Sequence, residues 1–206
     1  MTLPQTRAGP STWRITKVEP ANLHGPKMPP SIALVSPSAA LQDSYRGLVA
    51  EVTSLGEKLV PFVLGFEHHD IEAMLVRLAE CSRGLALPDG FVAHSTFWLV
   101  RDGTDVVGVS NIRHSLTAAL RREGGNIGYG IRPSARRQGF GVDILRQSLR
   151  RAGELGLTKA LVTCARENAA SVKIIINNGG VLESEEFFPD RNEVVQRYWL
   201  TADVRA

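Results

Sequence analysis

The pattern of apolar positions predicts two helices near the start of the folded part of the chain. Over residues 39–56 the residues spaced four, three and four apart are apolar, namely Leu41, Tyr45, Leu48 and Val52. This spacing is typical of one face of a helix. The run over 70–81 has the same period and starts at Asp70, a residue type that caps helices well.

From residue 95 onward the pattern changes to β-rich runs. The runs 95–101 and 106–112 flank Asp102-Gly-Thr-Asp105 and predict a hairpin. Four further strands are expected over 126–131, 159–164, 181–188 and 194–200, with the last two pairing through 189–192. Helices are expected over 141–155 and 168–178, the second ending at Asn178-Gly179-Gly180.

This order of elements predicts an α+β fold, in which helices flank a mixed, mostly antiparallel sheet. The strand–helix–strand unit between 126 and 164 implies one parallel pair of strands inside that sheet. Six of the eleven prolines lie within residues 1–30, where no hydrophobic period is visible. We therefore expect a loosely ordered extension over 1–30, with Met28 as a candidate alternative start, and a single domain over 31–206.

Composition and charge narrow the classes of function. The net charge of +3 is weak, and no basic stripe interleaved with aromatic residues is present, which argues against nucleic acid. Cys81 and Cys164 belong to no metal-binding spacing, so we expect reduced thiols and no metal. The chain has neither a signal-peptide pattern nor an apolar run long enough for a bilayer. These features predict a cytoplasmic protein without a membrane partner.

The loop between the strand ending at Ile131 and the next helix carries the clearest chemistry. Gly139 and Gly141 let the backbone approach a ligand closely. The first amides of a helix lack internal partners, and together with the helix dipole they attract phosphate. Arg136 and Arg137 add positive charge, so the sequence predicts a diphosphate site over 137–142. The competing interpretation is an ordinary turn that contains glycines, since the loop has neither a P-loop nor a GxGxxG motif.

Three motifs in this order resemble a known family. Arg136-x-x-Gly139-x-Gly141, Asn168-Ala-Ala-Ser171 and Asn178-Gly-Gly are similar to the signature of the GNAT N-acyltransferases. The region 92–200 resembles the family core, and Ile127-Gly-Tyr-Gly-Ile-Arg-Pro resembles a bacterial subgroup of predicted acetyltransferases. The resemblance implies a GNAT-like fold that moves an acetyl group from acetyl-CoA, as cosubstrate, to a primary amine of a small molecule or peptide. A CoA-binding sensor or interaction module with little turnover is the alternative.

The resemblance also implies where acetyl-CoA binds. The strands 126–131 and 159–164 would splay apart and hold the pantetheine arm between them, with backbone near Tyr129–Ile131 pairing with it and providing the oxyanion donor. The expected cofactor-binding residues are Ile131, Arg132, Arg136, Arg137, Gln138, Gly139, Phe140, Gly141, Val142, Asn168 and Ser171. For Asn168 a helix cap is an equally good role.

The catalytic residues are less well defined. Many relatives carry a tyrosine seven residues after the position of Asn168 as the acid for the leaving thiolate, but Ile175 stands there in this chain. The alternative acids for the thiolate are Tyr129, Cys164 and a water molecule. Glu123 is the first candidate for the general base. The alternative interpretation is that Glu123 is only an exposed glutamate of a loop. His114 and Glu67 are weaker candidates for the base.

The acceptor side has no diagnostic motif. The segment Glu67-His-His-Asp70 suggests either a metal site or, as we favour, a loop leading to the helix cap at Asp70. The helical part 31–90 is expected to form one wall of the acceptor pocket. Arg113-His114 and Arg121-Arg122 are candidates for lining it, with solvated surface as the default. The sequence leaves monomer and homodimer open.

Overall fold

The computed structural model describes Met1 and residues 31–202. The predictions for the extension over 1–30 and for Met28 therefore lie outside the described residues. Two antiparallel sheets form the centre of the fold. In the first sheet the strand order is β1 (Ile32–Val35), β2 (His94–Arg101), β3 (Asp105–Arg113) and β4 (Ile127–Ile131). In the second it is β5 (Lys159–Ala165), β7 (Glu193–Thr201) and β6 (Val181–Phe188).

The helices surround these sheets. They are α1 (Gln42–Ser54), α2 (Ile71–Ser82), α3 (Ala118–Arg122), α4 (Phe140–Glu154) and α5 (Ala169–Asn177), with single 3-10 turns η1 (Ala39–Leu41), η2 (Phe62–Gly65) and η3 (Pro133–Ala135). The predicted α+β class and both predicted hairpins are confirmed. The short helix α3 was not predicted, because five residues are too few to establish a period.

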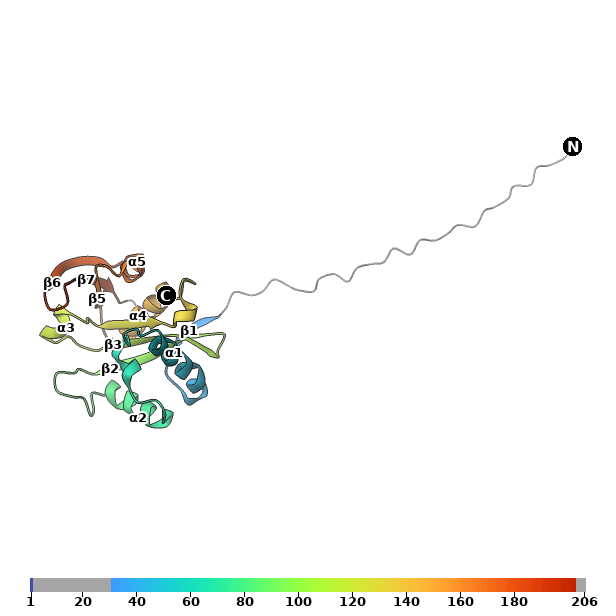
Figure 1. Ribbon diagram of the computed structural model, residues 1–206, viewed down its shortest axis with the longest axis horizontal. Helices are drawn as coiled ribbons and strands as arrows, with labels where there is room; N and C mark the ends of the chain where they lie inside the picture. The colour runs from blue at the N-terminus through green and yellow to red at the C-terminus, as the bar shows by residue number, and fades with distance from the viewer. Residues whose placement is uncertain (2–30, 203–206) are drawn as a thin grey trace.

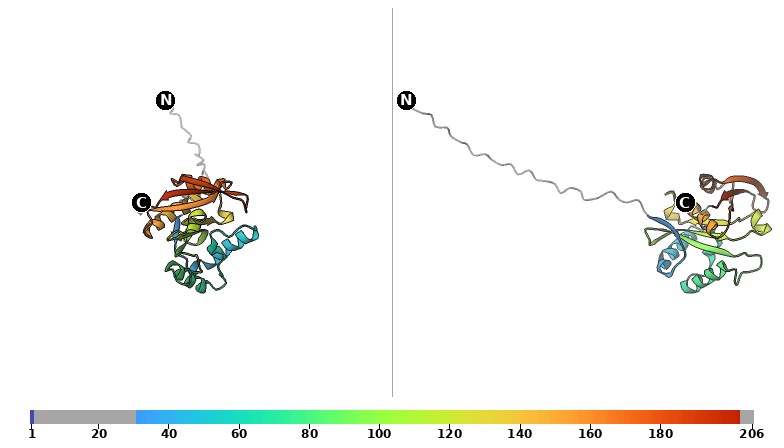
Figure 2. Two further views of the ribbon diagram at one scale, coloured as in Figure 1. Left: turned by 90° about the vertical axis from the view of Figure 1, so that its left-hand side faces the viewer. Right: turned by 180° about the vertical axis from the view of Figure 1, so that it is seen from behind.

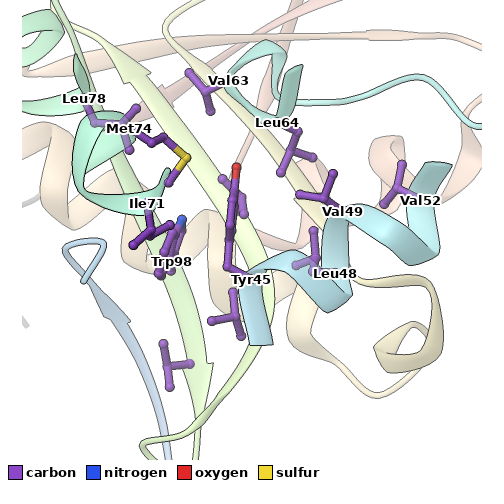
Figure 3. Packing of buried hydrophobic residues seen from close by; sticks show 13 residues of the cluster. Tyr45, Leu48, Val49, Val52, Val63, Leu64, Ile71, Met74, Leu78 and Trp98 are labelled. Atoms are coloured by element: carbon purple, nitrogen blue, oxygen red, sulfur yellow. The ribbon is translucent and has the colours of Figure 1, made fainter. Parts of the chain in front are cut away.

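The first sheet separates two layers (Figures 1 and 2). Helices α1 and α2 pack on one face, and α4 packs on the other. On the α1 side the Tyr45 ring stacks on Trp98, with centroids 4.5 Å apart (Figure 3). On the other side Ile144 and Leu145 of α4 are fully buried, and the central strands β2 and β3 are therefore covered on both faces.

Local sequence signals fix several element boundaries. Asp70 Oδ1 accepts a hydrogen bond from Ala73 N at 3.0 Å, which confirms the predicted cap of α2. Asp102 and Gly103 have φ values of 50° and 74°, and they form the centre of the tight turn that Thr104 N closes by donating to Arg101 O at 3.2 Å. The predicted helices and strands were therefore anchored by residues with a local conformational preference.

The two sheets meet at the start of β4. Asn126 N donates to Leu161 O at 2.6 Å, and Leu161 N donates to Asn126 Oδ1 at 2.9 Å. Gly125 allows this approach, because a Cβ there would lie 2.3 Å from Leu161 O and its φ is +58°. Within residues 31–202 every ladder is antiparallel and none joins β4 to β5. The parallel pairing expected for these two strands is therefore not confirmed.

The face of β4 away from α4 is covered by the segment after α1. A Cβ on Gly130 would lie 2.1 Å from Val60 O, whereas a Cβ on Gly128 would lie 3.5 Å from Pro61 Cβ. The first distance is a clash with backbone, and the second is an ordinary contact. Gly130 thus lets the Val60–Pro61 segment rest directly on the strand.

We predict that Gly130→Ala lowers the free energy of unfolding by about 1–3 kcal/mol, the usual cost of overpacking. The matched control is Gly128→Ala, which adds the same methyl group on the same strand and face where space exists. Urea unfolding of the two variants measures the difference. Equal stabilities would contradict the close contact between Val60 and β4.

Candidate functional site

The outer edge of β4 offers unpaired backbone groups. Arg132 N donates to Val107 O at 2.9 Å, which makes these two residues a hydrogen-bonded pair of the β3–β4 ladder. Such pairs alternate along an antiparallel ladder. Gly128 and Gly130 therefore direct their backbone groups at β3, and Tyr129 and Ile131 direct theirs at the free edge. The predicted pantetheine-binding stretch is thus at an edge that no described strand covers.

A row of free amides continues from this edge. The amides of residues 137–141 have no hydrogen-bond acceptor among the described residues. Val142 differs from its prediction, because its N–H donates to Gly139 O at 3.0 Å. Five consecutive donors at the start of a 15-residue helix form a suitable cradle for an anion.

The two glycines of the motif have different physical roles. Gly139 has a φ of +91°, and a Cβ there would meet nothing within 4 Å, so the open space at the helix start is real. A Cβ on Gly141 would lie 2.4 Å from Ile174 Cδ1. Gly141 therefore allows α4 to pack closely on α5. Its predicted second role, in which it lets the backbone approach a ligand, stays a prediction.

The arginines of the loop are held by carboxylates from α1 and the turn after it. Arg136 forms two hydrogen bonds with Glu57, at 2.8 and 2.5 Å. Arg132 Nε donates to Glu51 at 2.7 Å, and the same carboxylate accepts from Ser134 N at 3.0 Å. The Arg136 hydrogen bonds hold the pKa of Glu57 below its ordinary value. The loop is thereby positioned by residues about 80 positions earlier in the chain.

The remaining loop residues have other contacts. Arg137 has a φ of 64°, and the Gln138 side-chain amide donates to Ser134 O at 3.3 Å. Phe140 is 5% exposed and belongs to the core beneath the loop. The backbone amides of these three residues are all unpaired among the described residues.

A polar cluster lies between β4 and α5. The Tyr129 hydroxyl is 3.2 Å from Ser171 Oγ, and the Cys164 thiol interacts with the same serine. Burial raises the pKa of Tyr129 to about 12. Asn168 Oδ1 accepts from Ser171 N at 3.0 Å, so Asn168 does cap α5. The structure therefore brings Tyr129, Asn168 and Ser171 together.

Three other positions considered in the sequence have structural contacts of their own. Ile175 is fully buried in the apolar cluster formed by α4, α5 and the second sheet. Glu123 forms an ion pair with Arg191, with distances of 3.0 and 3.1 Å to its two oxygens. Glu67 accepts hydrogen bonds from the amides of His68 and His69, both at 2.8 Å. No group of three potential metal ligands occurs among the described residues.

No local sequence pattern indicates His94 and Asn111, which are buried at the start of β2 and in β3. Asn111 Nδ2 lies 2.9 Å from His94 Nδ1, within hydrogen-bond distance. Asn111 Oδ1 has no hydrogen-bond partner in the part of the chain that the structure describes. Burial, followed by the nearby positive charge of Arg113, lowers the pKa of His94 to about 4. Only the β2–β3 register reveals this pair.

Comparison with known proteins agrees with this geometry. A family model described as an acetyltransferase (GNAT) domain matches residues 62–181. No curated protein sequence matches the chain. No helix among the described residues combines the length and apolar character needed to cross a membrane.

Several solved structures share the fold. RimL, a ribosomal-protein α-N-acetyltransferase in complex with coenzyme A, has a TM-score of 0.60 and 15% identity, over 84% of this chain and 96% of that one. YncA of Salmonella typhimurium, a putative acetyltransferase with acetyl-CoA, has a TM-score of 0.55 and 13% identity, over 86% and 96%. The dodecameric spermidine N-acetyltransferase of Vibrio cholerae has a TM-score of 0.54 and 15% identity, over 83% and 94%.

The fold is thus that of a GNAT acyltransferase. Because the family model covers more than half of its length, the chain belongs to the GNAT acetyltransferase family. The predicted class of enzyme, an acyltransferase, is confirmed.

We predict that His94 makes stability fall in acid. The unfolded chain binds a proton on His94 near pH 6.5, but the folded protein does so only near pH 4. The contribution of neutral His94 to the free energy of unfolding is therefore complete above pH 6.5, and it is lost as the pH falls toward 4. His94→Gln should reduce the loss of unfolding free energy between about pH 7 and pH 4.5 by roughly 2 kcal/mol. Urea unfolding at both pH values tests this, and an unchanged pH dependence would contradict it.

Proposed function

We propose that this protein transfers an acetyl group from acetyl-CoA to a primary amine by direct attack of the amine on the thioester. The observation that carries the proposal is the row of unpaired amides over 137–141, which continues from the free edge of β4. A diphosphate bound by these amides would place its pantetheine arm along that edge. Membership of an acetyltransferase family supports the same reaction.

The pantetheine arm is itself an extended chain with amide groups. At the β4 edge the backbone groups of Tyr129 and the N–H of Ile131 are available to pair with it, whereas Ile131 O already accepts from Arg136 Nε at 3.3 Å. Arg136 and Arg132 are neutralised by Glu57 and Glu51. We therefore assign the diphosphate to the amides and the helix dipole, with the arginines holding the loop in shape.

In the chemical step the amine nitrogen forms a bond to the thioester carbon, and the carbonyl electrons move onto oxygen. A backbone N–H of the β4 edge would stabilise this oxyanion. As the intermediate collapses, the carbon–sulfur bond breaks and the CoA thiolate leaves, while the ammonium nitrogen loses a proton to give the amide product.

Tyr129 is the candidate donor for the leaving thiolate. Its hydroxyl is protonated near neutral pH, because burial raises its pKa to about 12. A group with such a high pKa stabilises the thiolate as a hydrogen-bond donor and is a weak source of a full proton. Glu123 remains the predicted base, although Arg191 engages both of its oxygens in the structure.

The proposed class of acceptor follows from the substrates named for similar structures. The similar structures include enzymes named for a protein α-amine and for spermidine, so both a peptide and a small amine are represented. We propose that the acceptor is an amine of a small molecule or peptide. We also propose that the protein is cytoplasmic and acts as a monomer or homodimer.

We predict that Gly139→Asp weakens acetyl-CoA binding at least about tenfold, because it places a carboxylate beside the bound diphosphate. Gly139→Asn is the matched control: it has the same shape and tolerates the same left-handed backbone, but it carries no charge. Isothermal titration calorimetry compares the two. If both variants bound acetyl-CoA equally well, the diphosphate would not lie at this helix start.

A second prediction concerns Tyr129. Tyr129→Phe should lower kcat about tenfold or more with little change in acetyl-CoA affinity, because the thiolate loses its donor. Tyr198→Phe is the control, since this residue is also buried but its hydroxyl donates to Gln196 Oε1 at 2.7 Å. A thiol-release assay gives the rates. Full activity of Tyr129→Phe would remove Tyr129 from the mechanism.

The absence of a tyrosine at Ile175 favours a second candidate, a CoA-binding sensor with little turnover. The same thiol-release assay separates the two functions. Binding of acetyl-CoA with no thiol release on a broad panel of amines would support the sensor.

A further inference from the structure

A cavity of about 260 Å³ lies at the end of β3, where Arg113 N donates to the carbonyl of Asn126, the residue before β4. Its walls include Phe62, Phe91, Val92, His94, Arg113 and Leu120. Phe62 in this lining belongs to the α1 and α2 side of the sheet. Phe62 directly follows Pro61, which rests on Gly128 of β4. The cavity therefore borders the strand that we propose binds the thioester arm, and it is small enough for a single low-molecular-weight acceptor.

Arg113 is the one formally charged side chain in this lining. Its Nη1 donates to the carbonyls of Gly124 and Gly125, at 3.0 and 3.1 Å, and its guanidinium lies 5.4 Å from the centre of the Phe62 ring. No carboxylate of the described residues forms an ion pair with it. Burial lowers the pKa of Arg113.

A half-buried cation without a counter-ion is unusual, because desolvation of a charge is costly unless an opposite charge compensates. The bonds to Gly124 and Gly125 use Nη1 and leave the other guanidinium donors available. A planar carboxylate matches such a group well. Arg113 is therefore suited to an anionic group of a bound molecule.

Apart from His94, the other side chains of the lining are apolar. The rings of Phe62 and Phe91 meet edge to face with centroids 5.6 Å apart, and Val92 and Leu120 contribute aliphatic surface. No acidic side chain is present in this lining. A polyamine would therefore meet the repulsion of Arg113 without a carboxylate to offset it.

We infer that this cavity binds the acceptor, with Arg113 pairing with its carboxylate and with Phe62 and Phe91 packing against an apolar group. The acceptor class is then a small amine that carries a carboxylate, such as an apolar α-amino acid. This inference rests on the proposed acetyl transfer and names its substrate class.

Four amines test the class in a thiol-release assay with acetyl-CoA. Phenylalanine and phenethylamine differ only in the carboxylate, spermidine is the polyamine, and phosphoethanolamine carries a phosphate. We expect kcat/KM for phenylalanine to exceed that for phenethylamine about tenfold or more, as the loss of a charge-assisted contact predicts, and spermidine to be the poorest. Equal values for the first two amines, or a preference for spermidine, would overturn the inference. If phosphoethanolamine were the preferred amine, the anionic group that the cavity recognises would be a phosphate and not a carboxylate. This result would also overturn the inference.

A variant pair tests Arg113 without removing its bonds to Gly124 and Gly125. Leu120→Glu places a carboxylate in the cavity beside Arg113 and should abolish the preference for phenylalanine. Leu120→Gln has the same shape without the charge and should keep the preference, even where it lowers both rates. Loss of the preference in both variants, or in neither, would overturn the role of Arg113.

Calorimetry with phenylalanine separates this inference from the proposed function. If no amine released thiol but phenylalanine bound to the wild type and not to Leu120→Glu, acetyl transfer would fail and the cavity assignment would stand. If amines were acetylated without regard to a carboxylate, acetyl transfer would stand and the cavity assignment would fail.

Discussion

Two hydrogen bonds between Asn126 and Leu161 join the two sheets at the start of β4, and the architecture of the site depends on them. They close one end of the space between β4 and β5. Beyond them no ladder joins the two strands within residues 31–202. The backbone of Tyr129 and Ile131 is consequently left at an open edge, which leads to the free amides at the start of α4. The same junction places the apolar cavity beside Arg113 close to the closed end.

The helical first part of the domain positions this site. Glu51 at the end of α1 holds Arg132 and the Ser134 amide, and Glu57 holds Arg136. The Val60–Pro61 segment then lies on Gly130 and Gly128 of β4. The predicted acceptor wall over 31–90 is thus also the support of the proposed cofactor loop. Any movement of α1 would change the shape of both binding regions.

The sequence was most informative where a residue has a strong local preference. Asp70 as a helix cap, the Asp102–Gly103 turn and the stop at Asn178-Gly-Gly all act within a few residues, so composition and spacing reveal them. The edge of β4 and the loop over 137–142 were likewise identified from a motif. The binding of acetyl-CoA by these residues stays a prediction.

Contacts between distant segments could not be predicted in this way. Arg136 meets Glu57 and Glu123 meets Arg191 across 79 and 68 positions. Gly141 proved to be a packing residue, because Ile174 of α5 occupies the space a side chain would need. Arg113 is a candidate pocket residue in the sequence, but the local pattern shows neither that it lacks a counter-ion nor which residues line its cavity. Tertiary packing decides these features, and one sequence contains no direct record of it.

The most direct measurement of the central claim is a titration of the backbone amide signals with acetyl-CoA by NMR. We expect the largest changes in chemical shift, and slowed hydrogen exchange, at the amides of residues 137–141 and of Tyr129 and Ile131. These are the donors that the fold leaves free. Unchanged signals at these positions, with acetyl-CoA bound and other amides shifted, would contradict the account.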